Sequence, residues 1–191
     1  MTAEQEKETL AAALNGNLKA FEALVVAYQD AVFSYVYNTT RNQMDAEELT
    51  QDVFVKAYTN LSKFRGDAKL KTWLFSIAHN TTASHYRKKE IPTTPADDAQ
   101  HLLNDHTIIG DALGLVTSTE RKKHLAAAME KMAPQQRQLI QLFYLEELSI
   151  KEIEEITGLN EGSIKTGVMR GRNRLYALLK ETLNDEIHTL L

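Results

Sequence analysis

The sequence predicts an all-α protein in which two small helical domains are joined by a flexible linker and the C-terminal domain contains a helix-turn-helix. Strong helix formers dominate the 191 residues, which include only 8 glycines and 3 prolines. Apolar residues recur at the three- and four-residue spacing of helices, without strand-like alternation. An acidic stretch with two prolines, residues 91–118, separates a domain at 1–90 from a domain at 119–191.

The N-terminal domain is expected to contain a series of amphipathic helices. The first is predicted by apolar residues at helical spacing between Phe21 and Val36. Asp45 and Glu48 suit a cap for the second, whose inward stripe is Leu49, Val53, Ala57 and Leu61. After a break at residues 64–67, the third has its core face at Leu70, Trp73, Leu74, Ile77 and Ala78.

The polar run at residues 79–82 predicts a loop or a weak helix end after the third helix. We expect Trp73 in the core because apolar residues surround it, although an aromatic ring can also stack on a base of single-stranded DNA. Phe75 and Tyr86 can each either pack inside the protein or contact DNA, and the sequence does not decide between the two.

Residues 149–175 have the pattern of a helix-turn-helix, preceded by a helix that starts at Pro134. Ser149 and Glu152 form a capping box, and Gly158 ends the first helix of the motif. The second helix places two apolar residues inward, Ile164 and Val168. It places four cations outward: Lys165, Arg170, Arg172 and Arg174. A cationic helix after a short helix and a glycine-containing turn suits the DNA major groove.

Charge is segregated along the chain, whose formal net charge is -4. Residues 1–62 and 90–120 are acidic, whereas residues 63–89 and the last helix are basic. Because DNA affinity rests heavily on neutralising phosphates, an acidic chain with a DNA-reading motif is expected to bind DNA weakly alone and to need a partner. The chain has no cysteine, no secretory signal pattern and no membrane-spanning run, so we expect a cytoplasmic protein without membrane insertion.

Other classes of function are less well supported by the residues. The 6 histidines form no metal-binding pair and no phosphate loop or nucleophile elbow is present, so we expect no enzyme, no metal and no cofactor. A free-standing helix-turn-helix regulator remains the alternative, although the basic block at residues 63–89 argues against it. A protein-binding adaptor is a third possibility, against which the cationic recognition helix argues.

Two runs carry a resemblance to a known family. DAEELTQDVFVKAYTNLSKFRGDAKLKTWLFSIAHN, residues 45–80, resembles the core-binding and promoter-melting region of bacterial sigma factors. MEKMAPQQRQLIQLFYLEELSIKEIEEITGLNEGSIKTGVMRGRNRL, residues 129–175, resembles their fourth region. The chain is therefore similar to the extracytoplasmic-function (ECF) group of the sigma-seventy family, over nearly its whole length except the linker.

The resemblance implies a protein without catalysis of its own that binds core RNA polymerase, at its clamp helices and flap, carries it to promoters and helps to melt DNA. Residues 1–90 would bind the polymerase and the minus-ten element, and residues 119–191 would read the minus-thirty-five element. The acidic linker at 91–118 would either imitate nascent RNA or act as a simple tether. An anti-sigma factor is expected from the family, although no residue here reveals one.

The polymerase-binding helix of the family matches one polar face with a single apolar contact: Asp45, Glu48, Gln51, Asp52 and Val55. Such a composition suits a non-obligate protein interface, and the alternative is an ordinary solvated acidic face.

The resemblance also places the minus-ten contacts on a set of polar and basic residues: Lys69, Lys71, His79, Asn80, Thr81, Thr82, Ser84, Arg87 and Lys88. Asn80 matches the family asparagine, and its amide offers both donor and acceptor to an extruded base; a helix C-cap is the alternative reading. The cations would hold phosphates and contribute affinity rather than base preference.

The minus-thirty-five contacts fall on the recognition helix: Ser163, Lys165, Thr166, Met169, Arg170, Arg172 and Arg174. Arginine and lysine read guanine in the major groove, whereas Arg172 and Arg174 can instead touch phosphate. The chain departs from the family at Glu154, Gly167 and Gly171. Gly167 either permits close approach of the backbone to DNA or weakens binding, which puts the promoter sequence in doubt.

Overall fold

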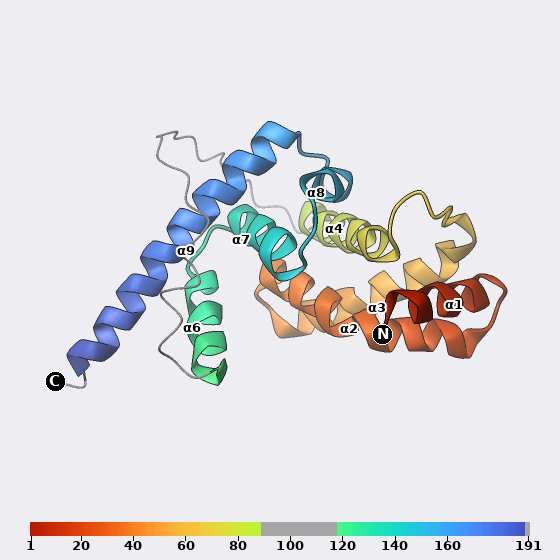
Figure 1. The fold of residues 1–191 in the computed structure, drawn as a ribbon, viewed down its shortest axis with the longest axis horizontal. Helices are drawn as coiled ribbons and strands as arrows, with labels where there is room; N and C mark the ends of the chain where they lie inside the picture. The colour runs from red at the N-terminus through yellow and green to blue at the C-terminus, as the bar shows by residue number, and fades with distance from the viewer. Residues whose placement is uncertain (89–117, 190–191) are drawn as a thin grey trace.

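The computed structural model describes residues 1–88 and 118–189, in which every regular element is helical (Figure 1). The predicted all-α class is confirmed. The predicted linker lies outside the described residues apart from Ser118, and so do its apolar positions Leu102, Leu103, Ile108 and Ile109. Its proposed imitation of RNA therefore stays a prediction.

The chain starts with helix α1 (Ala3–Leu14), which the apolar spacing did not predict. A capping box explains its start, because the Thr2 hydroxyl accepts from the Gln5 N–H and the Gln5 side chain accepts from the Thr2 N–H. Helix α2 (Leu18–Thr40) follows a turn at Gly16, whose φ of 86° suits glycine. The two helices pack together.

Helix α3 (Gln43–Asn60) begins earlier than expected. Asn42, and not Asp45, is the cap, because its side-chain oxygen accepts from the Asp45 N–H at 3.1 Å. The predicted inward stripe is confirmed at Leu49, Val53 and Ala57, and Leu61 continues it into the 3-10 turn η1 (Leu61–Lys63). The predicted break follows and includes Gly66 with a φ of 77°.

Helix α4 (Leu70–Lys88) runs without interruption through residues 79–82, so the predicted loop there is wrong. Packing overrides the weak local preference for helix, since Ala78, Thr81 and Thr82 are all buried. The Thr82 hydroxyl is satisfied within the helix, donating to the Ala78 carbonyl at 2.7 Å. Phe75 is fully buried against Tyr35, which decides for packing over DNA contact at that position.

The C-terminal helices follow the predicted signals closely. After α6 (Ser118–Glu130), Pro134 occupies the first turn of α7 (Pro134–Ile140), which continues as a π-helical turn, η2 (Gln141–Leu145). The capping box of Ser149 and Glu152 starts α8 (Ile150–Thr157), and Gly158 ends it with a φ of 69°. Helix α9 (Glu161–Thr189) then extends well past the motif.

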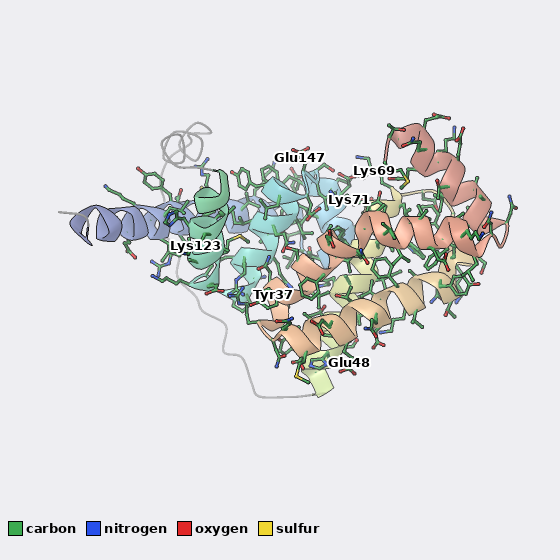
Figure 2. All side chains as sticks on the ribbon, turned by 90° about the horizontal axis from the view of Figure 1, so that it is seen from below. Tyr37, Glu48, Lys69, Lys71, Lys123 and Glu147 are labelled. Atoms are coloured by element: carbon green, nitrogen blue, oxygen red, sulfur yellow. The ribbon has the colours of Figure 1, made fainter. Side chains whose placement is uncertain are left out.

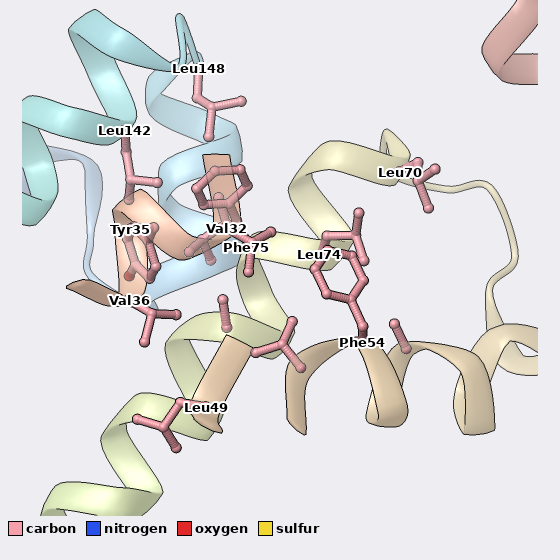
Figure 3. Packing of buried hydrophobic residues seen from close by; sticks show 14 of the residues in the cluster. Val32, Tyr35, Val36, Leu49, Phe54, Leu70, Leu74, Phe75, Leu142 and Leu148 are labelled. Atoms are coloured by element: carbon pink, nitrogen blue, oxygen red, sulfur yellow. The ribbon is translucent and has the colours of Figure 1, made fainter. Parts of the chain in front are cut away.

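Two apolar clusters form the interior of the part of the chain that the structure describes. The larger one joins the two halves of the chain, with Leu142 and Leu148 packed above Val32, Tyr35 and Phe75 (Figure 3). The smaller one lies within the C-terminal helices, and its buried members are Ala128, Met129, Met132, Ile140, Leu175, Leu178 and Leu179. Because one core is shared, the two helical domains pack against each other in this conformation.

Gly167 and Gly171 of helix α9 face this interior. A Cβ at Gly167 would overlap Leu139 Cδ1, and one at Gly171 would lie 2.8 Å from Ile140 Cγ1. A larger residue at either position would force Leu139 or Ile140 to shift, because α9 packs closely on α7. Close packing between helices is thus a reason for glycine at position 167 that the sequence did not reveal, and both readings of its effect on DNA binding stay predictions.

Candidate DNA and polymerase interfaces

Helix α3 presents most of its predicted polymerase-binding residues to solvent. Glu48, Gln51, Asp52 and Val55 are exposed, and Glu48 is marked in Figure 2. Val55 is 64% exposed, which is high for an aliphatic side chain and fits a contact surface. Asp45 is less accessible, since its Oδ2 lies 3.7 Å from His85 Nε2.

This face is longer than the resemblance predicted. Met44 and Tyr58 are 79% and 52% exposed and lie one turn from Glu48 and from Val55. Their spacing along the helix was visible in the sequence. Their exposure was not, because it depends on which face α2 and α4 cover.

The predicted minus-ten residues on α4 are only partly presented. Asn80 is exposed, but Thr81 and Thr82 are 4% and 1% exposed, which corrects the expectation that the whole run faces DNA. Thr81 instead accepts a hydrogen bond from Lys56 Nζ at 3.1 Å. His79 is half-buried, with Nδ1 at 2.9 Å from the Tyr35 hydroxyl, and burial lowers the pKa of its imidazole.

The end of α4 is more open. Arg87 is exposed and donates from Nη2 to the Ser84 hydroxyl at 3.0 Å. Lys88 is the last described residue of this helix, and Lys89 lies outside the described residues. Tyr86 is 41% exposed and donates from its hydroxyl to the Thr39 carbonyl at 3.1 Å, so it ties α4 to α2.

Lys69, just before α4, and Lys71, in its first turn, point toward the C-terminal helices (Figure 2). Lys71 Nζ lies 2.9 Å from Glu146 Oε2 and donates to the Glu146 carbonyl oxygen at 2.8 Å. Lys69 Nζ lies 3.0 Å from Glu152 Oε1, which also accepts from the Thr72 hydroxyl at 3.4 Å. These two of the predicted phosphate-binding cations therefore have carboxylate partners within the chain, and the Lys69 side chain stays 75% exposed.

Glu152 has two roles in this structure. It accepts from the Ser149 N–H at 2.8 Å and from the Ser149 hydroxyl at 2.6 Å, which completes the capping box of α8. Burial acts to raise the pKa of the Glu152 carboxyl, but the hydrogen bonds from Ser149 and the Lys69 ammonium outweigh it and lower the pKa to about 2.

In contrast to α4, helix α9 presents all the residues predicted to contact the minus-thirty-five element at least partly to solvent. Ser163, Lys165, Thr166 and Arg174 are exposed, and Met169, Arg170 and Arg172 are partly exposed. Lys165 pairs with Glu161 at 2.5 Å, and both side chains stay 62% exposed. A cavity of about 470 Å³ opens beside this face, lined by Phe143, Tyr144, Ile150, Lys165, Thr166, Val168, Met169 and Arg172.

A polar network joins α2 to α7 and η2. Asn38 Nδ2 donates to Gln141 Oε1 at 2.8 Å, and Gln141 Nε2 donates to the Ser34 hydroxyl at 3.2 Å. Arg137 Nη1 donates to the Asn38 carbonyl at 2.6 Å, and Gln138 Nε2 to the Thr39 hydroxyl at 2.8 Å. Sequence reasoning missed these residues and Glu146, because their partners lie 75 or more positions away.

Comparison with known proteins decides the family. Two family models match in order: Sigma-70 region 2 at residues 24–90 and Sigma-70, region 4, at residues 123–175. The ECF RNA polymerase sigma factor SigW of Bacillus subtilis is 32% identical over 173 residues, which cover 87% of this chain and 92% of SigW. This chain belongs to the ECF sigma factors of the sigma-70 family.

A second relative of this sigma factor is the ECF RNA polymerase sigma-E factor of Escherichia coli, 32% identical over 84% of this chain and 86% of the relative. Among solved structures, the sigma factor RpoE of Bartonella quintana, in complex with the anti-sigma factor NepR, matches with a TM-score of 0.60 and 26% identity. That match covers 85% of this sigma factor and 98% of RpoE. In the described helices, none is long and apolar enough to cross a membrane.

Proposed function

We propose that this chain is a sigma factor that binds core RNA polymerase, directs it to specific promoters and helps to melt the DNA for transcription initiation. One observation carries the proposal: the region 2 and region 4 matches occur in order on one chain, at residues 24–90 and 123–175. The free-standing regulator is not favoured, because a DNA-binding repressor or activator has no need of the region 2 match.

The proposal divides the work between the two domains. Residues 1–90 would dock on the polymerase through the exposed face of α3 and capture the minus-ten strand with Asn80 and the cations of α4. Residues 119–191 would contact the flap and place Lys165, Thr166 and Arg170 of α9 in the major groove of the minus-thirty-five element. The linker would pass between them at 91–118.

Two further parts of the proposal follow from the family. Sigma factors are regulatory subunits rather than enzymes, so we propose no catalytic activity here and a place of action in the cytoplasm with the polymerase. An anti-sigma factor is a proposed partner, supported by the complex of the similar RpoE with NepR.

A run-off transcription assay with purified core polymerase tests the proposal. We expect this chain to make the core start RNA at defined sites on genomic DNA fragments, and neither component to do so alone. Asp52→Lys should weaken co-purification with core polymerase because it reverses the charge of an exposed carboxylate on α3. Tight duplex binding by the chain alone, without any effect on core polymerase, would favour the free-standing regulator.

A further inference from the structure

One histidine of α4 is held by a buried tyrosine of α2. The Tyr35 side chain is fully buried and its ring packs edge-on against Phe75 (Figure 3). The Tyr35 hydroxyl lies 2.9 Å from His79 Nδ1. Burial raises the pKa of the Tyr35 hydroxyl and lowers the pKa of the His79 imidazole, so both groups are neutral near pH 7. The contact is therefore a hydrogen bond between two uncharged side chains.

The direction of this hydrogen bond follows from burial. A buried hydroxyl proton needs an acceptor, and His79 Nδ1 is the partner of the Tyr35 hydroxyl among the described residues. If Nδ1 carried a proton, the hydroxyl would have to accept, and its own proton would be buried without a partner. Tyr35 therefore donates and His79 accepts. Because a neutral imidazole carries one N–H, that proton lies on Nε2.

The Nε2 atom of His79 is open to solvent. The described side-chain atoms that are buried without a partner are Thr50 Oγ1, His85 Nε2 and Arg137 Nε, and His79 Nε2 is not one of them. The His79 side chain is partly exposed, and the residue that follows it, Asn80, is exposed. A fixed N–H donor and an exposed amide are thus neighbours on the part of α4 assigned to the minus-ten strand.

A fixed donor discriminates between the edges of unpaired bases. Carbonyl oxygens and ring nitrogens of a base accept from an N–H, whereas the amino groups of adenine and cytosine donate and are rejected by it. The Asn80 amide both donates and accepts, so it suits either kind of group. An imidazole free to exchange its two tautomers would have the same ambiguity. The hydrogen bond from Tyr35 removes this ambiguity from His79.

We propose that His79 is a specificity-determining residue whose Nε2–H donates to an acceptor atom of an unpaired base, and that Tyr35 is the positioning residue that fixes this tautomer. The identity of the ligand as the minus-ten strand rests on the proposed function. The tautomer rests only on the contact between the two side chains. A residue in the interior of the N-terminal domain thereby sets the hydrogen-bonding pattern on its surface.

Nitrogen-15 NMR of the histidine rings tests the tautomer in the full chain. The shift of each ring nitrogen reports whether it carries a proton, and the His79 signals are assigned by their loss in His79→Gln. We expect a protonated Nε2 and an unprotonated Nδ1 in the wild type. Tyr35→Phe keeps the ring on Phe75 and should give a mixture of tautomers. Tyr86→Phe is the matched control, because it removes another hydroxyl that ties α4 to α2, and should leave the His79 signals unchanged.

Base preference tests what the donor does. The holoenzyme formed with core RNA polymerase selects single strands from a pool with a short randomised segment, and the pool is sequenced before and after selection. We expect His79→Met to reduce the enrichment of the preferred base at one position about fivefold, as for the loss of one hydrogen bond. Tyr35→Phe should weaken the enrichment at the same position.

Two further variants separate base reading from general DNA affinity. His79→Gln should retain most of the enrichment, because its amide can accept from Tyr35 and donate to the base. Arg87→Gln removes an exposed cation of α4 and should lower the recovery of all sequences alike, because phosphate contacts do not depend on sequence.

An Nδ1–H tautomer in the wild type, or identical His79 signals in the wild type and Tyr35→Phe, would overturn the positioning role. If Tyr35→Phe fails to fold, the wild-type tautomer and the comparison of His79→Gln with His79→Met still decide. An active holoenzyme whose enrichment is unchanged by His79→Met, or reduced equally by His79→Gln, would overturn the base contact. Failure of the proposed function is distinguishable, since a chain that starts no transcription in the run-off assay still shows its tautomer by NMR.

Discussion

Helices α4 and α9 carry the two sets of residues assigned to DNA, and they present them in opposite ways. On α9 the polar and cationic candidates lie on a face open to solvent, as Lys165 and Thr166 illustrate. On α4 some candidates are buried, as at Thr82, or paired with carboxylates, as at Lys71, and others such as Asn80 are exposed. In this conformation one set of candidates is therefore open to solvent and the other is only partly open.

The difference follows from where each helix lies. Helix α4 packs on α2, α3 and α8, so most of its circumference is covered. The first turns of α9 form the outer helix of a helix-turn-helix and are covered on one side only, by α7 and α8. On α9, the polar and cationic residues suited to DNA are therefore also exposed or partly exposed. On α4, the same kinds of residue do not indicate which side chains are exposed.

The largest expected effect of this contrast is on stability. Phe75→Ala on α4 should lower the free energy of unfolding by about 3–5 kcal/mol, because the fully buried ring packs on Tyr35 at the junction of both domains. Lys165→Ala on α9 should change it by less than about 0.5 kcal/mol. Urea denaturation followed by circular dichroism measures both. A loss below 1 kcal/mol for Phe75→Ala would show that α4 is not the packed helix described here.

The glycines of α9 sharpen the contrast within one helix. Gly171→Ala should destabilise the chain by about 1–3 kcal/mol, because the new Cβ meets Ile140 at 2.8 Å and the Gln136 carbonyl at 3.4 Å. Gly162→Ala is the control, since its nearest neighbour is Asn160 Oδ1 at 3.5 Å, and it should be neutral or stabilising. Thermal unfolding of the two variants measures the difference, and the reverse order would contradict the packing of α7 on α9.

Adjacent residues of α4 should separate stability from promoter recognition. Thr82→Ala should cost roughly 1–2 kcal/mol of stability through the lost buried methyl and hydroxyl. The exposed Asn80→Ala should leave stability within about 0.5 kcal/mol and reduce promoter melting by the holoenzyme. Permanganate footprinting alongside thermal unfolding tests the pair. Reduced melting by a stable Thr82→Ala, with normal melting by Asn80→Ala, would reverse the assignment.

The stability of the chain in acid should depend on the contacts that Glu152 makes with Lys69 and with Thr72 of α4. The pKa of this carboxyl in the folded chain is about 2, below the ordinary 4.5, so its contribution to stability is complete above pH 4.5 and is lost as the pH falls toward 2. Glu152→Gln should remove that part of the pH dependence, an effect on the order of 1 kcal/mol. Denaturation curves between pH 5 and pH 2 compare the two chains, and parallel losses would contradict the assigned pKa.

The sequence predicted the fold where the signals are local. Pro134, the Ser149–Glu152 capping box and Gly158 each act within a few residues, and all were confirmed. Helix α1 was missed although Thr2 and Gln5 carry the same kind of capping signal, because its apolar spacing is weak. The loop at residues 79–82 was wrongly predicted because burial of polar side chains outweighed their propensity.

The residues of the candidate sites could likewise be predicted from the sequence only where the signal is local. The exposed face of α3 follows from helical spacing, so Glu48, Asp52 and Val55 could be found by pattern. The partners Glu146 and Gln141 could not, because contacts over such separations depend on how the two domains dock. The role of Gly171 was also out of reach, since the need for glycine comes from the position of Ile140 on another helix.

The central claim is that the chain works as a sigma factor whose two domains, packed together here, bind two separate promoter elements on the polymerase. The distance between the domains, measured in the free chain and on the polymerase, tests this claim most directly. The chain has no cysteine, so dyes can be attached at Val26→Cys on α2 and Tyr176→Cys on α9, two exposed positions, with little background. We expect efficient energy transfer in the free chain and a clear loss when core RNA polymerase is added. Unchanged transfer in a holoenzyme that starts transcription would contradict the account.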